Sequence, residues 1–81
     1  MLSTLLKENY QLKNQLIISK LTKREKEIIK LFAAGKTQKE ISEIMNISLN
    51  TVNTHRKNIF KKIGVTKLSE LVKFAYDTDM K

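Results

Sequence analysis

The sequence has no cysteine and no proline, and only two glycines among its 81 residues. Without cysteine the chain can build neither a disulfide framework nor a thiolate metal site, which is typical of a protein from a reducing cytoplasm. Folds made of short strands and tight turns use more proline and glycine than this chain has, so the shortage of both favours helices. We therefore expect an all-α, cytoplasmic protein.

Long apolar runs and catalytic sets of residues are also missing. No stretch approaches the roughly 18 apolar residues of a membrane-spanning helix, and the first residues lack the regions of a signal peptide. With one histidine, no cysteine and no glycine-rich phosphate loop, the sequence offers no nucleophile paired with a base. We expect neither an enzyme nor a membrane protein, and no cofactor or metal.

Acidic residues are scarce, and one long segment has none. The chain carries 16 Lys and Arg against 8 Asp and Glu, a formal net charge of +8. Between Glu43 and Glu70 there is no acidic residue, and the basic residues there are Arg56, Lys57, Lys61, Lys62 and Lys67. Such a concentration of positive charge favours a nucleic-acid partner, although a solvated basic surface without a partner has the same composition.

Capping residues divide the chain after residue 20 into four helices. Capping boxes at Thr22–Glu25 and Thr37–Glu40 begin the first two. Gly35 is suited to end the first, because glycine adopts the left-handed conformation without strain. The second is expected to bury an apolar stripe made of Ile41, Ile44 and Met45.

The connection 46–48 predicts a helix-turn-helix. Asn46 tolerates a positive φ, and Ser48 can cap a further helix that reaches about Ile63. Two helices joined by so short a turn cross steeply, which requires a small residue such as Ser42 on the first. Gly64 ends the second of them, and Thr66 opens the last helix.

The helix expected over 49–63 has one apolar and one polar side. At about 100° per residue, Val52, Ile59 and Ile63 fall on the side that faces the core. The opposite side carries asparagine, threonine and lysine, which can bond to adenine, touch the thymine methyl and bond to guanine. The residues predicted to contact base edges are Asn50, Asn53, Thr54 and Lys57. The residues predicted to contact phosphates are Lys36, Thr37, Thr51, Asn58, Lys61 and Lys62.

Residues 2–19 follow a short heptad pattern. Leucines at 2, 5, 12 and 16 fall on a and d positions, with Asn9 at the intervening a position. Glu8 and Lys13 have the spacing of an ion pair between the helices of a parallel dimer. The pattern fits equally well an amphipathic helix packed on its own domain. We assign residues 1–20 to an N-terminal helix that dimerises or links, and residues 21–81 to a DNA-binding domain.

Over about Leu21–Tyr76 the sequence resembles the LuxR/FixJ (GerE-type) helix-turn-helix domain. The motifs are Leu21-Thr22-Lys23-Arg24-Glu25, the run from Gly35 to Ile41, Thr51-Val52-Asn53-Thr54-His55 and Lys62-Ile63-Gly64-Val65. The resemblance implies a bacterial four-helix domain, preceded here by the amphipathic helix, that regulates transcription by binding double-stranded DNA as a homodimer. It also implies dimer contacts through the last helix. With the N-terminal leucine positions, the predicted dimer residues are Leu5, Asn9, Leu12, Leu16, Leu71, Phe74 and Ala75.

A protein-interaction module of the same architecture is the alternative. The region-four domain of sigma factors resembles this arrangement and contacts RNA polymerase, so polymerase is a second partner to consider.

The LuxR/FixJ family commonly has arginine at the position of Leu68 and alanine at that of Leu71, so the last helix of this chain is more apolar than is usual in that family.

Overall fold

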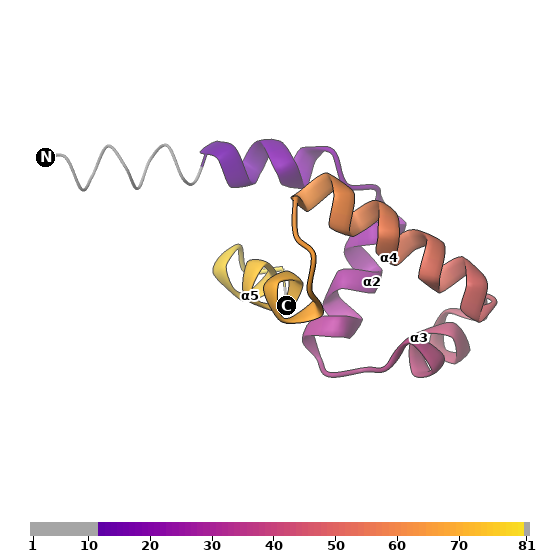
Figure 1. Cartoon of the computed structure of the whole chain (residues 1–81). Helices are drawn as coiled ribbons and strands as arrows, with labels where there is room; N and C mark the ends of the chain where they lie inside the picture. The colour runs from indigo at the N-terminus through magenta and orange to yellow at the C-terminus, as the bar shows by residue number, and fades with distance from the viewer. Residues whose placement is uncertain (1–11, 81) are drawn as a thin grey trace, which may run out of the picture.

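The structure, a computed structural model, describes residues 12–80, and every regular element in that range is a helix. The labelled helices are α2 (Lys23–Ala33), α3 (Gln38–Met45), α4 (Leu49–Ile63) and α5 (Leu68–Asp77). Residues 12–19 form a further helix that precedes α2 (Figure 1). The predicted all-α fold is confirmed. Leu5 and Asn9, two of the predicted dimer residues, lie outside the described range.

Short-range hydrogen bonds from capping side chains fix the start of α2, α3 and α4. In α2 and α3, the threonine hydroxyl accepts the backbone N–H of the glutamate three residues later, and that carboxylate accepts the threonine N–H. Both predicted capping boxes, Thr22–Glu25 and Thr37–Glu40, are therefore confirmed. Ser48 caps α4 by accepting the N–H of Thr51 at 3.1 Å, as predicted.

The last helix begins later than the sequence suggested. Its N-cap is Lys67, which makes no side-chain capping bond. Thr66 instead donates its hydroxyl to the Glu70 carboxylate at 3.1 Å. Thr66 thus supports the first turn of α5 from outside the helix, because the carboxylate of Glu70 reaches back to it.

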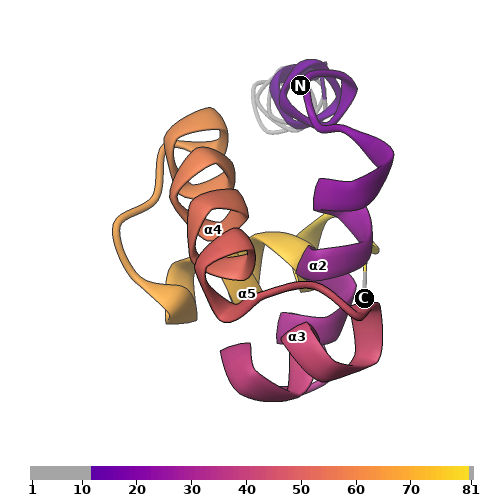
Figure 2. The same cartoon turned by 90° about the vertical axis from the view of Figure 1, so that its right-hand side faces the viewer.

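A left-handed residue ends α3 and redirects the chain. Asn46 has φ 56° and ψ 46°, the conformation predicted for it. The N–H of Ile47 then donates to the carbonyl of Ser42 at 3.0 Å, so a carbonyl of the last turn keeps a partner where the helix stops. Because the turn is this tight, α4 starts directly beside α3 and crosses it (Figure 2).

The core is built around α2, which packs against α3, α4 and α5. The largest fully buried side chains are Ile28, Ile29, Ile41, Val52, Ile59 and Leu71, so all four labelled helices contribute. In α4, Val52 and Ile59 face the core as predicted, and Ile63 is half-buried. The apolar side of α4 therefore packs in the core of the domain.

The prediction of a buried stripe on α3 is wrong at one position. Ile41 is fully buried and Met45 is half-buried, but Ile44 is 56% exposed. Ile44 lies above a shallow groove between α2 and α3, whose lining also includes Leu31. The reason is tertiary: α3 packs chiefly against α2 and α4, and these two helices leave Ile44, at the edge of its apolar face, uncovered.

Replacing Asn46 tests the left-handed turn. Asn46→Ala should lower the free energy of unfolding by about 1 kcal/mol, because a β-carbon without a compensating side-chain bond is disfavoured at positive φ. Asn46→Gly should lie closer to the wild type, since glycine has no such penalty. Urea denaturation of the three proteins measures both changes, and an alanine variant at least as stable as the glycine variant would contradict the assignment.

Candidate nucleic-acid interface

The polar side of α4 projects away from the rest of the molecule. Asn50, Thr54 and Lys57 are exposed, and Asn53 is half-buried. Their spacing of three and four residues places them on one face of the helix, opposite Val52 and Ile59, whose exposure is 0%. The four residues predicted to contact bases therefore share one accessible face of α4.

Thr54 has a restricted choice of partners. Its hydroxyl donates to the backbone carbonyl of Asn50 at 3.0 Å, one turn earlier in the same helix. The hydroxyl proton is therefore used inside the helix. What remains for an outside partner is the methyl group and the lone pairs of the oxygen, which suits contact with a thymine methyl better than donation to a base.

All six of the predicted phosphate contacts are exposed. These are Lys36, Thr37, Thr51, Asn58, Lys61 and Lys62. Lys36 and Thr37 lie at the start of α3, where backbone N–H groups and the helix dipole favour anions. A shallow depression of about 770 Å³ adjoins this start, and its lining includes Lys36, Lys39 and Arg56. Positive charge thus runs from the first turn of α3 to the middle of α4.

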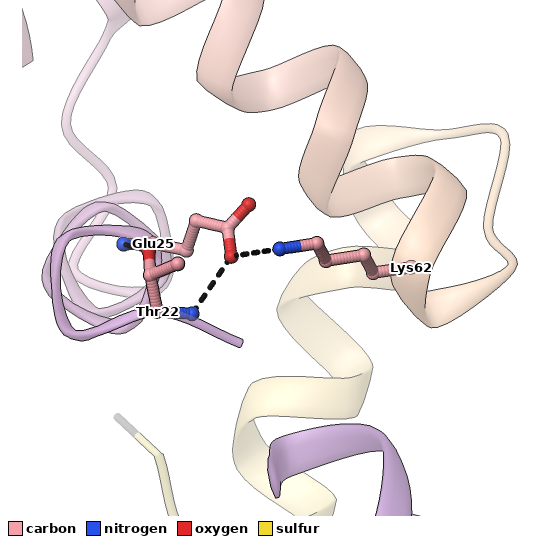
Figure 3. A network of polar contacts seen from close by, with 3 residues as sticks. All are labelled: Thr22, Glu25 and Lys62. Carbon is pink, nitrogen blue, oxygen red and sulfur yellow. Dashed lines mark hydrogen bonds and ion pairs between the residues drawn. The ribbon is translucent and has the colours of Figure 1, made fainter. Parts of the chain in front are cut away.

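Lys62, the sixth predicted phosphate contact, has a partner within the chain. Its Nζ donates to Oε1 of Glu25 at 2.7 Å, and the same oxygen accepts the N–H of Thr22 at 2.8 Å (Figure 3). The pair joins the last turn of α4 to the first turn of α2. Sequence reasoning missed it because 37 residues separate the partners and no local pattern links them.

The Glu25 carboxylate, which accepts the bond from Lys62, is buried, with 3% of the residue exposed. Burial works to raise its pKa, but the hydrogen bond from Lys62, the N–H of Thr22 and the charge of Lys62 outweigh burial and hold the pKa below its ordinary value. Glu25 is therefore ionised at neutral pH and keeps its bond to Lys62.

Arg56 rests on an aromatic ring of the same helix. Its guanidinium carbon lies 4.7 Å from the centroid of the Phe60 ring, and both residues are half-buried. A cation over the face of a ring is attracted by the ring's quadrupole, so this contact orients Arg56. The guanidinium also lines the depression beside α3, which keeps its charge next to the polar face of α4.

The predicted dimer residues fall into two groups. On α5, Leu71 and Ala75 are 0% exposed and Phe74 is half-buried, so Leu71 and Ala75 have no surface left for a second chain. The bulk of Leu71 is used inside its own core, against α2. Leu12 and Leu16, in contrast, are 58% and 64% exposed.

Other kinds of site are not seen between residues 12 and 80. That range holds no group of three or more metal-ligating side chains. None of its helices is long and apolar enough to cross a bilayer.

The fold and the exposed polar face of α4 together define a helix-turn-helix domain, in which α3 and the tight turn present α4 as the exposed second helix. A family model described as "Bacterial regulatory proteins, luxR family" matches residues 19–75. The chain belongs to that family, which confirms the resemblance seen in the sequence motifs.

Known relatives are regulatory proteins longer than this chain. The transcriptional regulatory protein MctR of Rhizobium johnstonii is 46% identical over 57 residues, which cover 70% of this chain and 27% of MctR. The uncharacterized response regulatory protein YgeK of Escherichia coli is 51% identical, over 70% of this chain and 39% of YgeK. The crystal structure of Escherichia coli SdiA matches with a TM-score of 0.70 and 44% identity, covering 75% of this chain and 26% of that one.

These relatives agree with the prediction of a regulator rather than an enzyme, since each bears the name of a regulatory protein or is a solved structure of one. The chain spans only 27% and 39% of the length of MctR and YgeK. The likeness therefore concerns the helix-turn-helix domain.

Removing Lys62 tests the ion pair. Lys62→Met should lower the free energy of unfolding by about 1–3 kcal/mol, because it leaves the buried Glu25 carboxylate without its charged donor. Lys61→Met removes the same charge from the neighbouring exposed position and should change stability by less than about 0.5 kcal/mol. Urea denaturation gives both values, and equal losses would show that the pair is not the cause.

The pH dependence of stability tests the same carboxylate independently. Because the folded pKa of Glu25 lies below the ordinary value of 4.5, its contribution is complete at neutral pH and is lost as the pH falls through the folded pKa. The stability difference between the wild type and Lys62→Met should therefore shrink on acidification. A difference that stays constant from neutral pH to about pH 3 would rule out Glu25 as its source.

Proposed function

We propose that this chain binds double-stranded DNA in a sequence-specific way and regulates transcription, with α4 as the recognition helix in the major groove. The observation that carries the proposal is the uninterrupted polar outer face of α4 within a segment, Glu43 to Glu70, that contains no acid between its ends. An α-helix fits the width of the major groove, and a face of this composition can bond to base edges.

Within α4 the proposal separates base contacts from phosphate contacts. Asn50, Asn53, Thr54 and Lys57 lie in the first two thirds of the helix, the part that normally meets the bases. The phosphate contacts are Lys36, Thr37, Thr51, Asn58 and Lys61, which are exposed around this face. Lys62 is assigned a different task, holding the recognition helix against α2 through Glu25.

Regulators of this kind commonly read two half-sites. We propose that the chain acts as a homodimer in the bacterial cytoplasm, with the two copies of α4 about one helical turn of DNA apart.

The second candidate function, contact with RNA polymerase, is favoured by Ile44, which is 56% exposed. Ile44 lies over a groove of about 470 Å³ that has both apolar and charged lining, as a protein partner would require.

Salt titration with two lysine variants tests the proposal. The probes are a duplex selected from a random pool and a scrambled duplex of equal length. The affinity of the wild type should fall with salt by about 0.9 log unit per log unit of salt for each neutralised phosphate. Lys57→Ala should cost about 1–3 kcal/mol on the selected duplex and little on the scrambled one. Lys61→Ala should weaken both duplexes alike and lower the salt slope by about 1.

Two outcomes would contradict the proposal. Equal losses for both variants on both duplexes would remove the division between base and phosphate contacts. Weak binding without sequence preference in the wild type would favour the protein-interaction module instead.

A further inference from the structure

The N-terminal helix, residues 12–19, has apolar residues on two opposite sides. Ile17 and Ile18 are half-buried, and Ile18 packs against the hydrophobic core of the domain. Leu12 and Leu16 are 58% and 64% exposed. At about 100° per residue, Leu16 lies about 200° around the helix from Ile18. The domain therefore covers one side of this helix and leaves the leucine side facing outward.

The C-terminal end of this helix is joined to the domain through Ile18, which packs against the core. The N–H groups of Lys20 and Leu21 donate to the carbonyls of Ile17 and Ile18, both at 3.0 Å, which closes its last turn. Leu21 follows at 5% exposure in the core, next to the cap of α2. The helix that carries the outward leucines projects from the bundle of α2 to α5 (Figures 1 and 2).

We propose that the outward face, Leu12 and Leu16, pairs in parallel with the same face of a second copy of this chain. A spacing of four residues is that of d and a positions in a heptad, and a face of this kind is complementary to its own copy. The sequence also supplies opposite charges at the flanking positions, Glu8 and Lys13, as a parallel pair requires.

The rest of the fold supports a second copy as the occupant. The other helix predicted to dimerise, α5, has Leu71 and Ala75 at 0% exposure, so these apolar residues are used within one chain. Leu12 and Leu16 are the most exposed of the large apolar side chains in the described range, whereas Tyr76 and Leu68 on α5 are 51% and 38% exposed.

Parallel pairing would relate the two domains by a two-fold axis and present two copies of α4 together. This consequence rests on the proposed DNA binding, whereas the pairing itself does not. A seam with two leucines in the described range buries little area, so the dimer is weak in solution and is strengthened when both domains bind one duplex, since the second binding event is then intramolecular.

Single-cysteine cross-linking tests the pairing directly, because the natural chain contains no other thiol. In a parallel, in-register pair, each residue of the seam faces its own copy within about the 4.4–6.8 Å between α-carbons that a disulfide spans. Leu12→Cys and Leu16→Cys should both form covalent dimers in a glutathione redox buffer without DNA. Ile44→Cys is the matched control, since Ile44 is 56% exposed on α3, and it should stay monomeric.

The outcomes separate the arrangement from its alternatives. Cross-linking of both leucine variants, with none for Ile44→Cys, supports the parallel pair. Cross-linking at position 16 but not at 12 overturns the in-register arrangement, and equal cross-linking of all three variants, or none, overturns the pairing. Circular dichroism of the reduced variants confirms that each one is folded.

Sedimentation equilibrium provides a second measurement. Leu12→Gln/Leu16→Gln should weaken self-association about tenfold or more, because it removes the apolar area that the seam buries, while Ile44→Gln should leave self-association unchanged. Affinity for a duplex with a single half-site should be the same in all three proteins. If the wild type does not bind the half-site duplex, the proposed function is wrong but the pairing is unaffected. If the wild type is monomeric at every concentration, the pairing is wrong.

Discussion

The bond between the Glu25 carboxylate and Lys62 joins the last turn of α4 to the first turn of α2. Glu25 takes part in the cap of α2 and also receives the lysine from the last turn of α4, so one side chain fixes the ends of two helices. The other end of α4 is fixed by Asn46 and the Ser48 cap, and Val52 and Ile59 hold its middle against the core. A helix fixed at both ends and along one side can expose a wholly polar face without losing its orientation.

Two adjacent lysines of α4 have different surroundings, and only one of them, Lys62, is paired with a carboxylate of the core. Successive residues on a helix point about 100° apart, so Lys62 reaches inward to a buried carboxylate while Lys61 stays on the outer side. Both lie in the last turn of α4, where positive charge is favoured by the helix dipole. Formal charge alone therefore overstates the surface available to DNA, because part of it is neutralised within the fold.

Features set by neighbours in the sequence were predictable, and features set by distant contacts were not. The capping boxes, the left-handed Asn46 and the two-sided character of α4 follow from interactions within a few residues, and the structure confirms them. Ile44 was wrongly assigned to the core because periodicity gives the direction of a side chain but not the extent of the neighbouring helix. The contact of Lys62 with Glu25 and the burial of Leu71 in the core come from the tertiary fold, so no local pattern in the sequence predicts them.

The placement of Leu71 also bears on how the molecule assembles. Leu71 is fully buried in the hydrophobic core, so its side chain adds no apolar surface to the outside of the domain. The N-terminal helix has the opposite arrangement, since one side completes the core through Ile18 and the other exposes Leu12 and Leu16. An exposed apolar face on a helix is unfavourable in water, so the leucine side of the N-terminal helix, and not Leu71, supplies the apolar surface on which the proposed pairing rests.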